Sequence, residues 1–187
     1  MINIVKSYDD FDEMELKIGG ILPFSLNDDQ FYFLMAKEGK NCKMEDRAMW
    51  GDFGGKINKD NGSNLEECVR HFWEQSNAII GSKAGLCEYI FNNFEKLLIL
   101  YSTIYEGILI FLPIDYDTKY ENIFYTTSVY HKMIMDRKKE WNKFKPKNLF
   151  GKEIIKWFSI EELNKHKKKF KKSNQEILDF INDTFNY

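Results

Sequence analysis

The chain has 187 residues, of which 43% are hydrophobic, 16% aromatic and 30% charged. This apolar content is enough for one sizeable core, so we expect a single domain over residues 1–187. With a formal net charge of -2, the composition excludes a disordered chain and a strongly basic nucleic-acid coat protein. The charge is uneven, however, because an acidic first part precedes a basic helical C-terminal region at about 159–187.

The cysteines and the apolar runs bear on location. Cys42, Cys68 and Cys87 form an odd set without metal-site spacing, which favours a reducing, cytoplasmic setting. The apolar run at 104–114 is interrupted by Glu106 and is too short to span a bilayer, so we expect no membrane contact. Frequent Lys, Asn and Ile are typical of AT-rich genomes, such as those of large DNA viruses, so a virus-infected host cell is one expected setting.

The first predicted elements are strands. Residues 16–26 and 30–37 are two β-rich runs, and the turn-forming residues 27–29 between them predict a β-hairpin. Residues 49–57 indicate a short strand that runs into a glycine turn at Gly54-Gly55.

A helix is predicted next, over residues 64–80. Ser63 and Glu66 have the S-x-x-E spacing of a capping box, in which each side chain bonds the backbone N–H of the other residue. Three apolar residues repeat at the spacing of one helical face and are expected to pack on the sheet: Leu65, Val69 and Phe72.

The second half alternates strands and helices. We expect strands at 96–101, 107–114 and 154–158, and helices at 125–144, 160–170 and 175–185. The helix at 125–144 is expected to turn Val129, Met133 and Trp141 toward the core, and Ser159 with Glu162 forms a second S-x-x-E capping box. No Pro- or Gly-rich linker divides the chain.

The segment from Gly54 to Ala78 resembles a degenerate Nudix box, the signature of the Nudix hydrolase superfamily. The family pattern is G-x5-E-x7-R-E-U-x-E-E-x-G-U, where U is a bulky apolar residue. Gly54-Gly55 resembles its opening, and its second half is matched by Arg70, Phe72, Glu74 and Ala78. Outside the box, residues 19–21 with 30–37 resemble the family's N-terminal hairpin, and 157–163 resemble its C-terminal strand-to-helix segment.

The resemblance implies an α/β fold. In this family the chain forms an α/β/α sandwich around a mixed β-sheet, with the box helix packed on the sheet. It also implies a ligand pocket at the Gly54-Gly55 turn.

The box implies metal-dependent chemistry, but its ligands are depleted here. Hydrolysis of a diphosphate needs Mg²⁺ or Mn²⁺ held by several carboxylates, which one helix supplies when they lie three and four residues apart. When the pattern is aligned on Arg70, three of its four glutamates are replaced by Gly62, His71 and Gln75, and Glu74 remains. Imidazole and amide groups bind hard cations poorly, so metal affinity is expected to fall steeply.

The resemblance, together with the helix face that Glu67, Arg70, His71 and Glu74 are expected to share, assigns roles to particular residues; at the position of Glu67 the family itself usually has a small or variable residue. Catalytic roles fall to Glu74, Glu67 and Arg70, and metal contacts to Glu74, Glu67 and the carbonyl of Gly55. Ligand contacts are expected from Gly54, Gly55, Lys56, His71, Gln75 and Trp50. Two alternatives stay open: Arg70 either braces the helix through Glu67 or Glu74 or touches phosphate, and Trp50 either stacks on a base or lies in the core.

Three functions remain in view. The first is a binding protein, a pseudoenzyme that reads a nucleotide, a dinucleotide or an mRNA cap without efficient hydrolysis. The second is an active diphosphohydrolase that uses Mg²⁺ or Mn²⁺, with carboxylates relocated to Glu67 and Glu74 or to Glu106, Asp115 or Glu121. The third is a scaffold that has kept only the fold. The basic run is either a solvated helix end or an RNA contact made by Lys165, Lys167, Lys168, Lys169, Lys171 and Lys172.

Overall fold

The computed structural model describes residues 1–39, 48–137 and 151–185. Within them the chain forms one mixed sheet of eight strands in the order β1-β6-β7-β2-β3-β4, with β5 added on β2 and β8 on β3. The strands are β1 (Ile2–Ile4), β2 (Ile18–Asn27), β3 (Gln30–Glu38), β4 (Trp50–Gly51), β5 (Phe53–Lys56), β6 (Ile99–Ser102), β7 (Gly107–Pro113) and β8 (Lys152–Ser159). The pair β2 and β7 is parallel and the other pairs are antiparallel.

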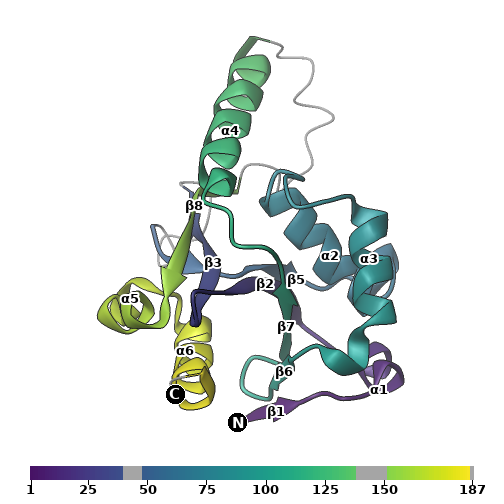
Figure 1. Cartoon of the computed structure of the whole chain (residues 1–187). Helices are drawn as coiled ribbons and strands as arrows, with labels where there is room; N and C mark the ends of the chain where they lie inside the picture. The colour runs from purple at the N-terminus through teal and green to yellow at the C-terminus, as the bar shows by residue number, and fades with distance from the viewer. Residues whose placement is uncertain (40–47, 138–150, 186–187) are drawn as a thin grey trace.

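Helices cover both faces of the sheet, so the expected α/β/α sandwich around a mixed sheet is confirmed (Figure 1). One face carries α2 and α3 and the other carries α5 and α6, while α1 lies near the start of the chain and α4 extends away from the body. The helices are α1 (Tyr8–Glu13), α2 (Asn64–Gln75), α3 (Lys83–Asn92), α4 (Lys119–Arg137), α5 (Ile160–Lys165) and α6 (Lys172–Phe185).

Each face of the sheet has its own apolar cluster. The residues expected to anchor α2 are all buried in the first cluster: Leu65, Val69 and Phe72. The second cluster joins the opposite face to α5 and α6 through residues such as Phe111, Phe158 and Leu178. Alternate residues of a strand point to opposite faces, which is why neighbours such as Ile21 and Leu22 of β2 enter different clusters.

The predicted β-hairpin is confirmed as β2 and β3. Along the same edge, β2 pairs with two different strands. Asp28 and Asp29 form the turn with φ angles of 50° and 60°, which Asp tolerates better than most residues. The second half of β2 pairs with β3, whereas its first half, Ile18 to Ile21, pairs with β5. The change of partner places β5 beside the start of β2.

The predicted glycine turn at Gly54-Gly55 is wrong. Both residues lie inside β5, where Gly54 pairs with Gly20 and Gly55 with Gly19 of β2. Close approach by neighbouring groups on both faces, and not a tight turn, explains these glycines. A pocket beside these residues therefore lies along a strand and not at a turn.

Two predicted helices end early. α2 stops at Gln75, and Asn77 and Ala78 follow with φ angles of 56° and 59°, outside the helical region. α5 stops at Lys165 and is followed by a 3-10 turn, Lys167–Lys169. The sequence reading also missed β1, α1 and α3, which carry short or irregular apolar patterns.

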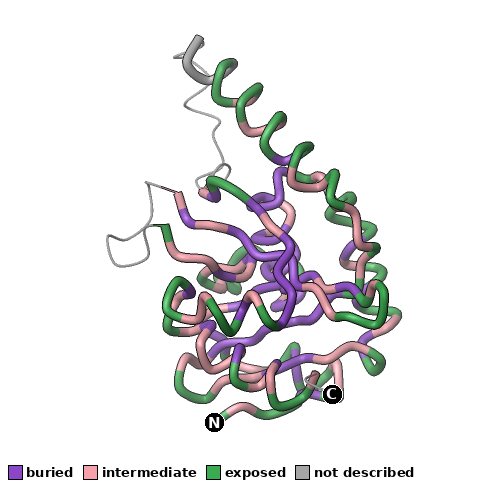
Figure 2. The backbone as a smooth tube through the Cα atoms, turned by 60° about the vertical axis from the view of Figure 1, so that its left-hand side comes forward, coloured by how far each residue is buried: buried purple, intermediate pink, exposed green. Residues whose placement is uncertain are grey.

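The expected core face of α4 is wrong for the residues that can be judged. The side chains of Val129 and Met133 are 40% and 52% exposed, and Trp141 lies outside the described residues. Among the side chains of α4 whose burial is described, the buried part lies near the beginning of the helix (Figure 2), where Phe124 joins the first cluster. No helix in the described ranges combines the length and apolarity needed to cross a membrane.

Candidate functional site

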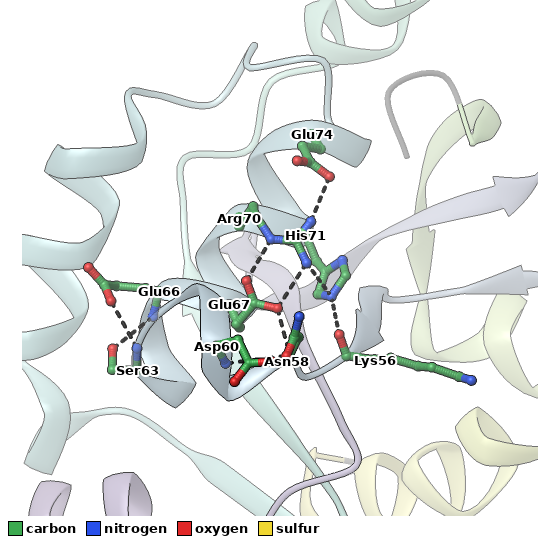
Figure 3. Close-up of polar contacts among 9 residues, drawn as sticks. All are labelled: Lys56, Asn58, Asp60, Ser63, Glu66, Glu67, Arg70, His71 and Glu74. Atoms are coloured by element: carbon green, nitrogen blue, oxygen red, sulfur yellow. Dashed lines mark hydrogen bonds and ion pairs between the residues drawn. The ribbon is translucent and has the colours of Figure 1, made fainter. Parts of the chain in front are cut away.

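The start of the box helix is set by the predicted capping box. The Ser63 hydroxyl accepts from the Glu66 N–H, and the Glu66 carboxylate accepts from the Ser63 N–H at 2.9 Å. Glu66 is therefore committed to the cap. The next carboxylate, that of Glu67, points instead toward the strand side, where α2 meets the loop that follows β5 (Figure 3).

Arg70 lies between the two carboxylates expected to bind metal (Figure 3). Its Nε and Nη2 donate to the two oxygens of Glu67 at 2.7 and 2.9 Å, and its Nη1 donates to Glu74 at 3.0 Å. Bidentate guanidinium–carboxylate pairs of this kind are stronger than ordinary hydrogen bonds. Of the two roles left open, the structure places Arg70 in the bracing one.

Glu67 is buried and fully engaged. One of its oxygens also accepts from the backbone N–H of Asn58 at 3.1 Å, which ties the helix to the loop after β5. The hydrogen bonds from Arg70, opposed by burial and aided by the Asn58 N–H, lower the pKa of Glu67. The carboxylate is therefore ionised at neutral pH, and its charge is matched inside the protein by Arg70.

His71 bonds to a backbone carbonyl of β5. Its Nε2 lies 2.8 Å from the carbonyl oxygen of Lys56 and 3.1 Å from Nη2 of Arg70. Because the carbonyl can only accept, the shorter contact places the proton on Nε2. Burial, aided by the charge of Arg70, lowers the pKa of His71, so the ring is neutral at neutral pH. Its Nδ1 is buried without a hydrogen-bond partner in the described part of the chain.

Gln75, like His71, bonds to a backbone carbonyl of β5. Its Nε2 donates to the carbonyl of Gly54 at 2.9 Å, and its Oε1 is buried without a partner among the described residues. Positions 71 and 75 are glutamates in the family pattern. In this chain they are His71 and Gln75, neutral donors that bind strand carbonyls. A carboxylate could make neither contact, because it has only acceptors.

The residues present do not fit a divalent metal. The described residues include no group of three or more His, Cys, Asp or Glu side chains arranged to hold an ion. Of the acids considered as relocated ligands, Glu106 pairs with Lys17, and Glu121 accepts from the backbone N–H of Trp157 at 3.0 Å. Mg²⁺ or Mn²⁺ would have to displace Arg70 from both of its carboxylates.

The four paired glycines of β2 and β5 divide between the two faces of the sheet. A Cβ on Gly55 would overlap the ring of His71, and one on Gly19 would overlap the sulfur of Cys68, so these two admit α2. A Cβ on Gly20 or Gly54 would instead overlap a carboxylate oxygen of Asp52 on the other face.

Asp52 lines a cavity of about 500 Å³ that the sequence reading did not foresee. The cavity lies between the sheet and the start of α6, and both Gly54 and Gly55 border it. Its polar wall includes Asp52, Asn174, Lys171 and Lys172, and its apolar wall comes mostly from β2, β6, β7 and α6. One signal was available: Asp52 and Gly54 are two apart in an extended segment and so share a face.

The remaining predicted residues lie in different surroundings. Trp50 packs edge-on against Phe158 in the second apolar cluster, with ring centroids 4.9 Å apart. Lys56 is exposed in its side chain and uses its carbonyl to accept from His71. In the basic run, Lys167 pairs with Asp179 and Lys171 with Glu38, while the exposed members are Lys165, Lys168, Lys169 and Lys172.

Comparison with known proteins gives similar backbones only. No family model matches the chain, and no curated protein matches its sequence. Among solved structures, the NUDIX domain of Shewanella oneidensis NrtR complexed with ADP ribose has a TM-score of 0.49 at 10% identity. The alignment covers 95% of this chain and 92% of that chain.

Two further structures have lower scores. A C. elegans Ap4A hydrolase binary complex has a TM-score of 0.47 at 12% identity, covering 91% of this chain and 98% of that chain. A second structure of Shewanella oneidensis NrtR has a TM-score of 0.43 at 11% identity, covering 90% and 63% respectively. Likeness at this level assigns neither activity nor ligand to this chain.

Proposed function

We propose that this chain is a Nudix-fold protein that binds a ligand of the nucleoside-diphosphate type and has lost efficient metal-dependent hydrolysis. The observation that carries the second part is the position of Arg70, which donates to both Glu67 and Glu74. A bound Mg²⁺ requires several oxygen ligands, most of them charged. Here both carboxylates already bind an internal cation, so a metal competes with a buried ion pair.

The neutral donors on α2 support the same conclusion. His71 and Gln75 occupy carbonyl oxygens of β5 that would otherwise be available to a cation. Metal binding would require both bonds to break and both donors to lose their partners, at a cost of roughly 1 kcal/mol for each net hydrogen bond. These contacts stabilise the site without metal.

The cavity beside Gly54 and Gly55 supports the binding part of the proposal. Its volume of about 500 Å³ falls in the range of about 300–1,000 Å³ that small-molecule sites occupy. Apolar strand residues suit a planar base, and Lys172, exposed at the start of α6, suits an anionic group. A nucleotide, a dinucleotide or an mRNA cap has this combination of groups.

The test is binding measured beside hydrolysis. We would titrate GDP, ADP-ribose, a dinucleoside polyphosphate and capped RNA calorimetrically in EDTA, and assay each for turnover with Mg²⁺ and then Mn²⁺. We expect binding of at least one compound, an unchanged Kd when the metal is removed, and no turnover above background. Metal-dependent turnover that disappears in Glu74→Gln would contradict the proposal and favour the active hydrolase with relocated carboxylates.

A restored box gives a second test. The double variant His71→Glu with Gln75→Glu replaces two donors by carboxylates beside Glu67 and Glu74. We expect it to unfold at lower temperature than the wild type without metal, and to be stabilised by millimolar Mn²⁺, to which the wild type does not respond. The single variant His71→Gln, which adds no charge, is the control. An equal Mn²⁺ response in the wild type would overturn the loss of the metal site.

Capped RNA is the candidate ligand that would also use the basic run. Lys171 and Lys172 border the cavity, and exposed Lys168 and Lys169 lie in the 3-10 turn just before them in sequence. A phosphate backbone leaving the cavity along these lysines would make binding weaken steeply with salt. Affinity for capped RNA that equals affinity for the cap dinucleotide alone would exclude this use of the lysines. Binding of no compound in the panel would leave the scaffold hypothesis.

A further inference from the structure

Two residues that line the cavity each have a hydrogen-bond acceptor without a matching donor in the described part of the chain. Asp52 uses one carboxylate oxygen to accept from Asn174 Nδ2 at 3.0 Å. Its other oxygen lies over Gly20 and Gly54 and has no donor among the described residues. Asn174 is 1% exposed, and its Oδ1 likewise has no partner there. Both residues line the cavity.

The position of Asp52 is built into the fold. Only residues without a Cβ at positions 20 and 54 leave room for its carboxylate against the sheet. The Asn174 amide fixes one carboxylate oxygen, and the Lys152 Nζ donates to the Asp52 carbonyl at 3.1 Å. The carboxylate is thus fixed by the sheet and by Asn174, and its backbone by Lys152, so it is pre-organised for a ligand.

The charges around Asp52 indicate a neutral donor and not a cationic one. Lys152 and Lys171 share the single carboxylate of Glu38, which leaves one positive charge to balance Asp52. Lys172 also borders the cavity, so among the described residues the lysines outnumber these carboxylates by one, and a cationic ligand would add to that excess. The unmatched acceptors call for N–H groups on an uncharged ring.

The apolar walls favour a flat, base-sized ring. Ile18 of β2, Leu100 of β6 and Leu109 of β7 face the cavity, and Ile177 of α6 approaches from the helix side. Aliphatic side chains on two sides form a slot in which a planar ring buries both of its faces.

We infer that this cavity selects a guanine base, whose N1–H and exocyclic N2 amino group donate to Asp52; the inference rests on the proposed function. Guanine presents these two donors side by side, which matches a carboxylate. Adenine presents one amino group beside the N1 acceptor, and uracil presents one N–H between two carbonyls. Each would place an acceptor against the acceptors of the site.

The experiment compares three diphosphates that differ in the base. With the wild-type protein in EDTA, we expect GDP to bind at least about tenfold more tightly than ADP. IDP, which lacks the N2 amino group, should lie between them. Equal affinities for the three, or binding of none of them, would overturn the inference. The proposed function would be overturned as well only if ADP-ribose, the dinucleoside polyphosphate and capped RNA also failed to bind.

One variant of Asp52 should lose affinity for GDP and gain affinity for another diphosphate. In Asp52→Asn the amide offers a donor in place of one acceptor, so the affinity for GDP should fall at least about tenfold. The affinity for xanthosine diphosphate, which carries a C2 carbonyl in place of the amino group, should rise. Misfolding cannot produce that gain. Asp9→Asn, on exposed α1, is the matched control, and a GDP preference retained by Asp52→Asn would overturn the role of this carboxylate.

Discussion

The two faces of the sheet at the paired glycines of β2 and β5 differ in how their polar side chains are matched. On the α2 face, Arg70 matches the carboxylates, and His71 and Gln75 bind strand carbonyls. On the α6 face, Asp52 and Asn174 line a cavity and keep acceptors without donors. His71 and Gln75 also keep one unmatched acceptor each, but neither borders the cavity. The comparison supports the proposal that α2 serves stability and that a ligand binds on the opposite face.

Removal of Arg70 should have the largest effect on this comparison. Arg70→Ala leaves Glu67, 1% exposed in its side chain, as a buried charge without its partner. We expect the free energy of unfolding to fall by about 3 kcal/mol, measured by urea denaturation at neutral pH. Lys59→Ala, in the exposed 3-10 turn before α2, is the control and should change the free energy of unfolding by less than about 0.5 kcal/mol.

The result also separates two views of the ion pair. A loss below about 1 kcal/mol for Arg70→Ala would mean that water reaches Glu67 and that the pair contributes as little as a surface salt bridge. In that case Arg70 would be free to touch phosphate, and its role on the α2 face would need revision.

Alanine at the two neighbouring glycines of β5 should distinguish the faces. Gly55→Ala pushes against His71 and Gly54→Ala against Asp52, so each should destabilise the protein by about 2 kcal/mol through overpacking. Only Gly54→Ala is expected to weaken GDP binding strongly, because only it displaces the carboxylate that faces the cavity. Calorimetric titration of GDP into both variants checks this. Equal losses of affinity would contradict the assignment of ligand binding to the Asp52 face alone.

The smallest effect concerns pH. Burial lowers the pKa of His71 in the folded protein, so below about pH 6.5 the unfolded chain takes up a proton that the folded chain resists. Stability from this group is therefore complete above pH 6.5 and is lost as the pH falls toward the folded pKa. Urea denaturation at pH 7.5 and 5.5 should show this loss, and His71→Gln should reduce it. An unchanged slope in the variant would assign the pH dependence to other groups.

Several parts of the fold could be predicted because local chemistry dictates them. Ser63 with Glu66 and Ser159 with Glu162 form the predicted capping boxes, since each box needs only residues within one turn of helix. The hairpin before them follows from two β-rich runs joined by residues that tolerate positive φ. The end of α2 was less predictable, because Asn77 is held by the hydroxyl of Ser128, far along the chain.

The candidate site shows where such prediction stops. The sequence indicated that Glu67, Arg70, His71 and Glu74 share a helix face, and the structure places them together. It could not show that Arg70 would bind both carboxylates, because side chains at that spacing also accommodate a metal. Whether the carboxylates bind a metal or Arg70 depends on which donors lie within hydrogen-bonding distance in the folded protein.

The sequence by itself determined the first hairpin, the two capping boxes and the apolar face of α2, because these depend on neighbours within a few residues. Only the tertiary structure decided that Gly54 and Gly55 lie in a strand, and that Asp52 meets Asn174, 122 positions away. A glycine pair fits a turn or a crowded strand equally well, since it lacks a Cβ in both. The choice depends on which groups approach it. Here those groups are His71 of α2 on one face and, on the other, Asp52, whose carboxylate is held by Asn174 of α6.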